Sequence, residues 1–452
     1  MKYNILKIAV LAISMASCGL YSKHTTPNIE NANSLAGVDK PIPDTAAVPV
    51  PSWQEVFTDK NLQDLITTAL DTNSDLRTAA LTVEEVQQRF KTSRLTFLPS
   101  FALAPEASIA SMGGSNNIKS YNLPIQASWE IDIFGKLRNA KEQTRSLLQQ
   151  SKDYEQLIKT QIIAAVASNY YALVLTDKHI EITQNSYDTM SETLEAMKAL
   201  KEVGLTNETA IIQMSANLKD IYIALQDLNE NFNIAQNNIC LLLNTSPYKV
   251  KFTKQEDINL NRTLTSSISL AALSNRPDVR AAEMTLSQSF YGVNYARASL
   301  YPNIKLMGGA GFANAEGMVN PGKMLFTALG SITQPLFAAG ALRSNLKIAK
   351  INYEKSLIGF EKILLTAGKE VNDALMQCET ARRKKMLGDR QVIELSRAVE
   401  ITKELMVAGQ ANYLEVLSAQ NSYLSSLLGQ TAGWYGYALG EINLYKALGG
   451  GL

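Results

Sequence analysis

The sequence contains the same order of elements twice, and this internal repeat limits its possible folds more than any other feature. The stretch from Arg94 to Phe101 (RLTFLPSF) returns from Arg297 to Ile304 (RASLYPNI), and the shared prolines are 302 − 99 = 203 residues apart. Further on, Phe134 to Arg138 is echoed by Phe337 to Arg343. A period of about 200 residues is far longer than one solenoid unit. It predicts a duplicated half-domain whose two halves lie side by side in one shell.

Composition argues against several functions. The 452 residues contain 43 Lys and Arg against 42 Asp and Glu, so the formal charge of +1 favours no nucleic acid partner. The chain has two histidines, and it shows no metal-ligand spacing, phosphate-binding glycine loop or nucleophile elbow. We therefore expect no catalytic residue, metal or cofactor.

The amino terminus has the features of an export signal. Lys2 and Lys7 precede an apolar stretch, Ile8 to Ala16, which is too short for a permanent membrane anchor. It ends in Met15 to Gly19 (MASCG), which resembles a bacterial lipoprotein signal. Cleavage before Cys18 would make this cysteine the lipidated end of the mature chain. The alternative is a plain signal peptide with an incidental cysteine.

The segment after the signal is expected to be an extended tether. Residues 18–52 are rich in Pro, Asn, Thr and Ala, and Pro41, Pro43, Pro49 and Pro51 disfavour a helix. From residue 53 onward, helical spacing of apolar residues begins. The ordered body is thus expected to start at Trp53.

The two remaining cysteines, Cys240 and Cys378, lie in helical stretches among apolar neighbours. A disulfide is one interpretation in an exported chain, but buried free thiols are favoured. No segment after the signal reaches about 18 consecutive apolar residues, so no membrane-spanning helix is predicted. Such a chain can still cross a membrane as a β-barrel.

Each half contains two strand-like regions around a loop. In the first half the loop is 110–120, and from Leu123 to Ile133 apolar and polar residues alternate. One apolar face and one wet face suit a sheet between lipid and a lumen, although a half-buried strand of a soluble sheet shows the same pattern. In the second half, 304–312 and 325–335 flank a loop at 314–323. The expected lumen-facing residues are Gln126, Ser128, Glu130 and Asp132.

Long helices follow both pairs of strands. Lys136 to Val203 is free of proline and glycine for 203 − 136 + 1 = 68 residues, which is about 100 Å of helix. The second half likewise has no proline after Pro335. Helices of this length need neighbours along their length, so a coiled-coil assembly is predicted. Gly204 and Gly409, 205 residues apart, end the two runs and indicate tight hairpin tips.

Strand number predicts an oligomer. Four strands cannot close a membrane barrel, because known barrels need eight or more. Open strand edges in lipid would each leave backbone groups unpaired, at a cost of several kcal/mol. Several chains must therefore share one barrel if these strands lie in a membrane.

Several motifs, in the right order, resemble one family. They are Arg276 to Glu283 (RPDVRAAE), Trp129 to Arg138 (WEIDIFGKLR), Asn412 to Gln420 (NYLEVLSAQ) and the ending Ala447 to Gly451 (ALGGG). Together they resemble the NodT-type outer membrane factors, lipoproteins related to TolC. The resemblance runs from about residue 53 to the end of the chain. It implies a mainly α protein with a small β-barrel part, a TolC-like homotrimer with one α-barrel and one β-barrel.

The resemblance also implies a function and partners. The trimer would sit in outer membrane lipid as the passive exit duct of a tripartite efflux system. Its partners would be a periplasmic adaptor (membrane fusion) protein and an inner membrane pump of the resistance-nodulation-division (RND) class. The expected organisation is a signal peptide at 1–17, a tether at 18–52 and two repeats at 53–260 and 261–452.

Site residues follow from the same resemblance. Glu415 lies just after the second tip, where relatives are narrowed by acidic residues, and Tyr413 lies beside it. A ring of like charges at a narrow point attracts cations, so these two residues are the expected gate; an ordinary solvated helix residue is the alternative for Glu415. Ser418 replaces a second acidic position. The expected adaptor-docking tips are Val203, Gly204, Leu205, Thr206, Ala408, Gly409 and Gln410.

Two other functions remain open at this point. One is the exit channel of a type I-like secretion system, against which the lipoprotein signal and the Arg-Pro-Asp segment argue. The other is a non-channel coiled-coil lipoprotein of the envelope, against which the alternating strand argues. In the Arg-Pro-Asp segment itself, proline at a helix start with aspartate next to it indicates a structural role and no catalytic one.

Overall fold

The computed structural model describes residues 22–25, 51–110, 118–204, 206–260, 273, 275–314 and 323–450. The signal peptide, Cys18 and Leu205 lie outside these residues. The chain divides into two compact units, and each takes segments from both sequence repeats. Unit 1 contains 80–154 and 280–363, and unit 2 contains 30–79, 155–279 and 364–452.

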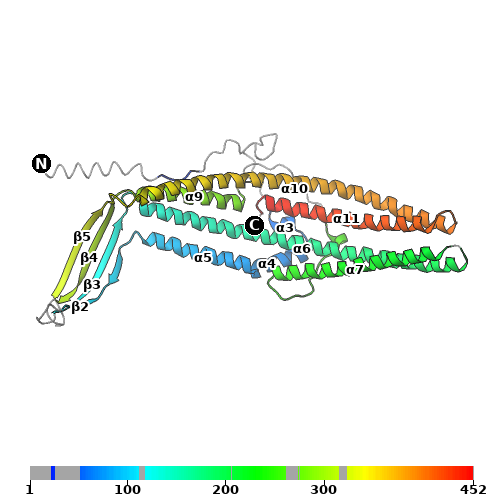
Figure 1. The fold of residues 1–452 in the computed structure, drawn as a ribbon, viewed down its shortest axis with the longest axis horizontal. Coiled ribbons are helices and arrows are strands. Elements are labelled where there is room, and N and C mark those ends of the chain that lie inside the picture. Colours follow the sequence, from blue (N-terminus) through cyan, green and yellow to red (C-terminus); the bar gives the residue numbers. More distant parts are fainter. Residues whose placement is uncertain are drawn as a thin grey trace. The chain divides into compact units, whose positions relative to one another are not determined.

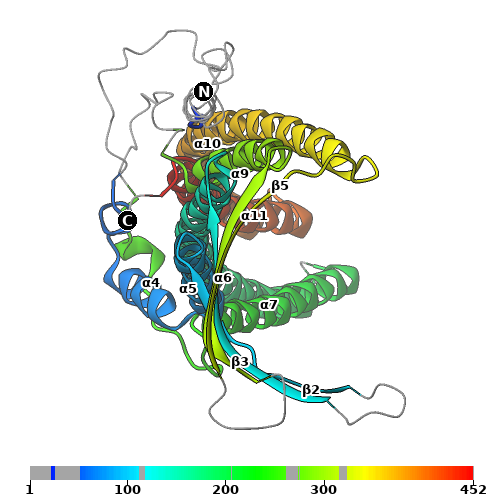
Figure 2. The ribbon, with the colours of Figure 1, turned by 90° about the vertical axis from the view of Figure 1, so that its left-hand side faces the viewer.

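Unit 1 is built on one antiparallel sheet, whose strands lie side by side as a single curved layer (Figures 1 and 2). The strand order is β1-β3-β4-β5. Strand β2 pairs with the same edge of β3 as β1 does, next to β1 along that edge. Two strands were expected in the first half, but its described residues form three, because β1 and β2 pair with successive parts of the longer β3. The strands are β1 (Ser100–Leu103), β2 (Glu106–Ala110), β3 (Ile118–Ile131), β4 (Asn303–Asn314) and β5 (Lys323–Thr333).

The β3–β4 pairing depends on one glycine. Pro124 lies inside β3 and faces Gly311 of β4. A Cβ atom at Gly311 would be 2.4 Å from the Leu123 carbonyl oxygen and 2.5 Å from the Pro124 Cα. Glycine in a strand marks such a close backbone approach. Gly311 therefore allows β4 to stay paired across a proline.

Both faces of the sheet are open in the single chain. Apolar side chains such as Trp129, Phe326 and Ile332 are exposed, and the polar side chains of Gln126 and Ser128 are exposed as well. A soluble sheet normally packs one face on a core. This sheet therefore lacks the packing that a soluble half-buried strand would have.

The helices of the two halves match in length. There are 22 residues in each of α5 and α9, 67 in each of α6 and α10, and 35 in each of α7 and α11. Their starts are offset by 203 to 205 residues (277 − 74, 341 − 136 and 413 − 208). The bounds are α5 (Ser74–Leu95), α6 (Lys136–Glu202), α7 (Glu208–Leu242), α9 (Pro277–Ala298), α10 (Ala341–Val407) and α11 (Tyr413–Ala447), preceded by α3 (Trp53–Val56) and α4 (Lys60–Thr72), with a short 3-10 turn, η2 (Gln255–Asp257), after α7.

Unit 2 contains the main hydrophobic core, where α4 and parts of α6, α7 and α11 meet. Tyr170 is fully buried, and its hydroxyl donates to Asp59, the residue that caps α4. Tyr171 packs edge-on against Trp434, with ring centroids 5.8 Å apart. Both tyrosines therefore serve packing between helices. Cys240 and Cys378 are free thiols, as expected; Cys240 is buried, whereas Cys378 is half-buried.

Among the residues that the structure describes, one helix is long and apolar enough to cross a membrane by length and composition alone. It is α6, and 56% of its apolar window is buried inside the protein. The sequence predicted no such helix, because polar residues interrupt its apolar runs. Ile163, Val166 and Leu173 of α6 are fully buried in the unit 2 core, so core packing accounts for the apolar character of α6.

The Arg-Pro-Asp segment has the structural role expected of it. Pro277 is the first residue of α9, and the Asp278 carboxylate accepts from the Val279 amide within the first turn. Proline and aspartate are both favourable at a helix start. Arg276 is 5% exposed and holds Asp278 at 2.7 Å and Glu370 at 2.6 Å. The guanidinium is therefore a buried structural clamp.

Candidate functional site: the helical tips and the lumen-facing residues

Two glycines make the hairpin turns of unit 2. Gly204 has φ of 78° and Gly409 has φ of 71°, and each follows the last turn of a 67-residue helix. This left-handed conformation is one that glycine adopts without steric cost. The α6–α7 and α10–α11 turns are therefore built in the same way, and α7 and α11 run back alongside the long helices (Figure 1).

The tips present exposed apolar side chains next to small and polar residues. Val203 is 69% exposed and Val407 is 82% exposed. Ala408, Gly409 and Gln410 are also exposed, and Thr206 is half-buried. Exposed apolar residues at a turn that contributes nothing to the core are typical of a contact surface. The structure thus places the predicted tip residues, other than Leu205, on the surface.

Asparagine begins the returning helix at both tips. The Asn207 side chain accepts from the Ala210 amide at 2.9 Å. The Asn412 side chain accepts from the Leu414 amide at 2.9 Å and the Glu415 amide at 3.2 Å. An asparagine cap satisfies amides that the first helical turn leaves without partners. Each tip is therefore fixed by a positive-φ glycine and an asparagine cap.

Glu415 is exposed at the start of α11 and is part of this cap. Its carboxylate accepts a hydrogen bond of 2.9 Å from the Asn412 side-chain amide. Negative charge in the first helical turn is also stabilised by the helix dipole. Glu415 therefore has a local structural role, and one oxygen of its exposed carboxylate remains available to solvent-borne ions.

Tyr413 connects the two hairpins. Its hydroxyl donates to the Gln213 side-chain oxygen on α7. The Tyr413 ring also packs against the small core near the first tip, which includes Met197 and Met214. One turn further on, Leu417 packs on the same core. The side chain that was expected to constrict the tunnel therefore joins α11 to α7.

The expected lumen-facing residues divide into two groups. Gln126, Ser128 and Glu130 share one face of β3, and Glu130 is ion-paired with Lys136 at 3.1 Å. Asp132 lies beyond the end of β3, so its assignment to the strand was wrong. Its carboxylate accepts from the Arg138 amide at 2.8 Å, in the first turn of α6. The alternation of apolar and polar residues continues past the end of β3 because the next polar residue, Asp132, caps the start of α6.

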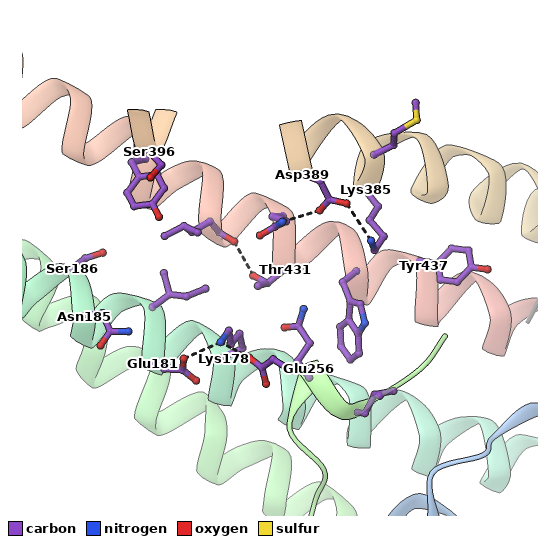
Figure 3. Close-up of a pocket in the computed structure, with 18 of the residues that line it drawn as sticks. Lys178, Glu181, Asn185, Ser186, Glu256, Lys385, Asp389, Ser396, Thr431 and Tyr437 are labelled. Carbon is purple, nitrogen blue, oxygen red and sulfur yellow. Dashed lines mark hydrogen bonds and ion pairs between the residues drawn. The ribbon is translucent and has the colours of Figure 1, made fainter. Parts of the chain in front are cut away.

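A groove of about 1810 Å³ lies in unit 2 between α6, η2, α10 and α11 (Figure 3). Its walls contain ion pairs that are already satisfied: Lys178 with Glu181 at 2.8 Å and with Glu256, and Lys385 with Asp389 at 3.2 Å. Within the described residues, no group of three or more His, Cys, Asp or Glu side chains is placed to hold a metal ion. The groove is thus a polar surface of mixed charge.

Sequence reasoning missed the buried charges. Asp153 is 3% exposed and pairs with Arg280 at 3.0 Å, while burial raises the pKa of Asp153 and the nearby Arg280 charge opposes this. On α11, Glu441 is buried without a basic partner at its carboxylate oxygen Oε1. Both carboxylates lie in helical stretches whose sequence would look the same if the side chain were exposed to solvent. Only the packing of neighbouring helices reveals them.

Comparison with known proteins agrees with this architecture. The family model "Outer membrane efflux protein" matches twice, over residues 65–245 and 269–450. The probable outer membrane lipoprotein SilC of Salmonella typhimurium is 27% identical over 410 residues, which cover 88% of each chain. The toluene efflux pump outer membrane protein TtgC of Pseudomonas putida is 24% identical over 474 residues, covering 100% of this chain and 96% of TtgC.

The fold is also that of a solved channel. A crystal structure of CusC superposes with a TM-score of 0.86 at 24% identity and covers 96% of this chain and 100% of CusC. With the family model matching most of the chain in two copies, the class is defined. The chain belongs to the outer membrane efflux protein family, and its fold is TolC-like. It is an outer membrane efflux channel protein.

Proposed function

We propose that this protein is the exit duct of a tripartite efflux system and that three copies share one β-barrel. The observation that carries the proposal is the sheet of unit 1. Within the described strands, β5 pairs only with β4, and β1 and β2 pair only with β3. The sheet thus has two open edges, which is unfavourable in lipid unless another chain covers them.

Strand direction supports closure in a ring. All pairs are antiparallel, so β5 runs with β3, and β1 and β2 run with β4. The β5 edge of one copy therefore meets the β1–β2 edge of the next copy in the favourable antiparallel sense. Because β1 and β2 share one edge of β3, each chain fills four strand positions. Three copies fill twelve, which exceeds the minimum of about eight for a closed membrane barrel.

The tips support an adaptor contact. Val203 and Val407 stand exposed beside turns that are rigidly set by glycine and asparagine. We propose that the periplasmic adaptor protein docks there and that an inner membrane RND pump supplies the energy. The repeats 53–260 and 261–452 each supply one tip. Cys18 is proposed as the lipid attachment site that holds the chain to the outer membrane.

The cargo is proposed only as small molecules or ions delivered by the pump. The curated relatives include a cation efflux system protein, CusC, and a toluene efflux pump protein, TtgC. Of the proposed lumen-facing positions on β3, Gln126 and Ser128 are polar and uncharged, and the charge of Glu130 is paired with Lys136. Such a lining selects weakly, so cargo choice rests with the pump.

Ion conductance of the purified protein in planar bilayers tests the duct. We expect a small cation-preferring conductance, and we expect Glu415→Gln to reduce the preference for cations, since it removes the proposed ring of charge. Glu208→Gln is the matched control, because Glu208 lies in the first turn after the other tip. A protein that is monomeric in mild detergent, or that conducts no ions even after Glu415→Ala, contradicts the proposal.

A further inference from the structure

Glu441 is an acidic side chain placed where a charge is poorly tolerated. It lies in the last two turns of α11 and is 9% exposed. Its Oε1 atom is buried without a hydrogen-bond partner in the described part of the protein. The Tyr437 hydroxyl, one turn earlier on α11, hydrogen-bonds to the carboxyl group. A buried carboxylate normally has a cation or several donors around it.

The helices packed around Glu441 supply no cation in contact with it. Arg382 of α10 is exposed and pairs with Glu379 at 3.1 Å. The titratable and charged groups around Glu441 come from three helices. Tyr437 lies on α11 itself, Cys378 and Arg382 lie on α10, and Tyr171 lies on α6. Asp59 lies beyond Tyr171.

The contact next to Glu441 is unusually close. A Cβ atom at Gly440 would be 2.9 Å from the Cys378 Sγ and 3.2 Å from the Cys378 Cα. The α10 helix thus lies directly on the α11 backbone at the residue before Glu441. Because close-packed interiors hold no spare volume, the helices have to separate to admit water around an ionised Glu441.

Burial determines which protonation state of Glu441 is favoured at this position. It raises the pKa of Glu441 to about 7 from the ordinary value of 4.5, and the Tyr437 hydrogen bond opposes the rise. Burial also raises the pKa of Cys378 to about 11, so the neighbouring thiol stays neutral near pH 7. The neutral carboxyl is therefore the form that the packed helices favour.

We infer that Glu441 is a proton-operated switch for the packing of α11 against α10 and α6. When protonated, it stays buried beside Cys378, and the Gly440 contact remains closed. When ionised, it draws water between the helices and loosens α11 around Gly440. The inference concerns this helical packing and stands apart from the proposed duct.

The direction of the pH effect follows from the two states. The unfolded chain releases the Glu441 proton near pH 4.5 and the folded chain near pH 7. Folded-state stability from this group therefore falls as pH rises between these values, and it falls no further above about pH 7. Below pH 4.5 both states are protonated and the effect vanishes.

Hydrogen exchange of the full-length protein in detergent, at pH 5.5 and pH 8.5, tests the switch. After correction for intrinsic exchange rates, we expect protection of the α11 amides around Gly440 in the wild type to be lower at pH 8.5 than at pH 5.5 by up to about thirtyfold. Glu441→Gln should keep its protection at both pH values. Glu394→Gln, an exposed position on α10, is the matched control and should behave as the wild type does.

Two outcomes overturn the switch. One is equal protection of the wild type at both pH values, and the other is an unchanged pH dependence in Glu441→Gln. If Glu441→Gln does not fold, Cys378→Ala serves instead, since it opens space for water beside the carboxyl group. The midpoint of the pH effect should then move below that of the wild type, and an unmoved midpoint also contradicts the inference.

Discussion

The Arg276 guanidinium donates a hydrogen bond of 2.9 Å to the main-chain oxygen of Ala447, so the start of α9 is tied to the last residue of α11. The same guanidinium binds Asp278 and reaches Glu370 on α10. These two carboxylates account for its raised pKa against the cost of burial. One side chain thus holds three helices together.

Removing this clamp should destabilise the protein strongly. Arg276→Ala leaves the half-buried Asp278 carboxylate and the Ala447 oxygen without the guanidinium, and leaving such acceptors unsatisfied costs about 1–3 kcal/mol. Chemical denaturation followed by circular dichroism measures the change. Arg382→Ala, which removes an exposed pair on α10, should leave the midpoint unchanged. Equal effects of both variants would show that the clamp contributes nothing.

Removing the arginine of the Asp153–Arg280 pair in unit 1 should lower the stability of the protein by an amount that depends on pH. Arg280→Ala leaves a buried carboxylate unpaired, so we expect a loss of several kcal/mol at pH 8. Without the arginine charge, the pKa of Asp153 rises further, so the loss should shrink as the pH is lowered and the carboxyl becomes neutral. Urea denaturation at pH 8 and pH 5 measures this. A loss that is independent of pH argues against the pair.

The close contact at Gly440 should reject a methyl group. Gly440→Ala places Cβ against Cys378, and overpacking of this kind costs about 1–3 kcal/mol. Gly436→Ala is the matched control on the same helix, because nothing lies within 4 Å of its added Cβ. It should stabilise by about 0.5–1 kcal/mol through higher helix propensity. Thermal unfolding of both variants distinguishes them, and an equal sign for both would be unexpected.

The Tyr413–Gln213 contact should restrain the tips. Tyr413→Phe removes the hydroxyl that joins α11 to α7 but keeps the ring in its apolar contacts. If the proposed duct narrows at the tips, the variant should conduct more ions than the wild type in planar bilayers, with folding unchanged. Tyr423→Phe, also on α11, is the control. Unchanged conductance of Tyr413→Phe separates this contact from gating.

The spacing of apolar residues and the positions of proline and glycine made much of the fold predictable. The absence of proline and glycine after Lys136 predicted one long helix, and α6 ends at Glu202, next to the predicted tip. Gly204 and Gly409 predicted the tips, because a left-handed turn needs glycine. These are local properties of the backbone, so the sequence shows them directly. The alternation of apolar and polar residues from Leu123 likewise predicted a strand. The observed strand, β3, begins earlier, at Ile118.

The sequence by itself determined the repeat, the long helices, the tips and the family. Only the tertiary structure decided which charges are buried and what they contact. Glu415 and Glu441 are both glutamates on α11, and their surrounding sequence does not distinguish a helix cap from an unpartnered buried carboxyl. The difference comes from α10 and α6, which cover Glu441 and leave Glu415 in solvent. Burial is set by residues distant in sequence, so it appears only when the helices pack.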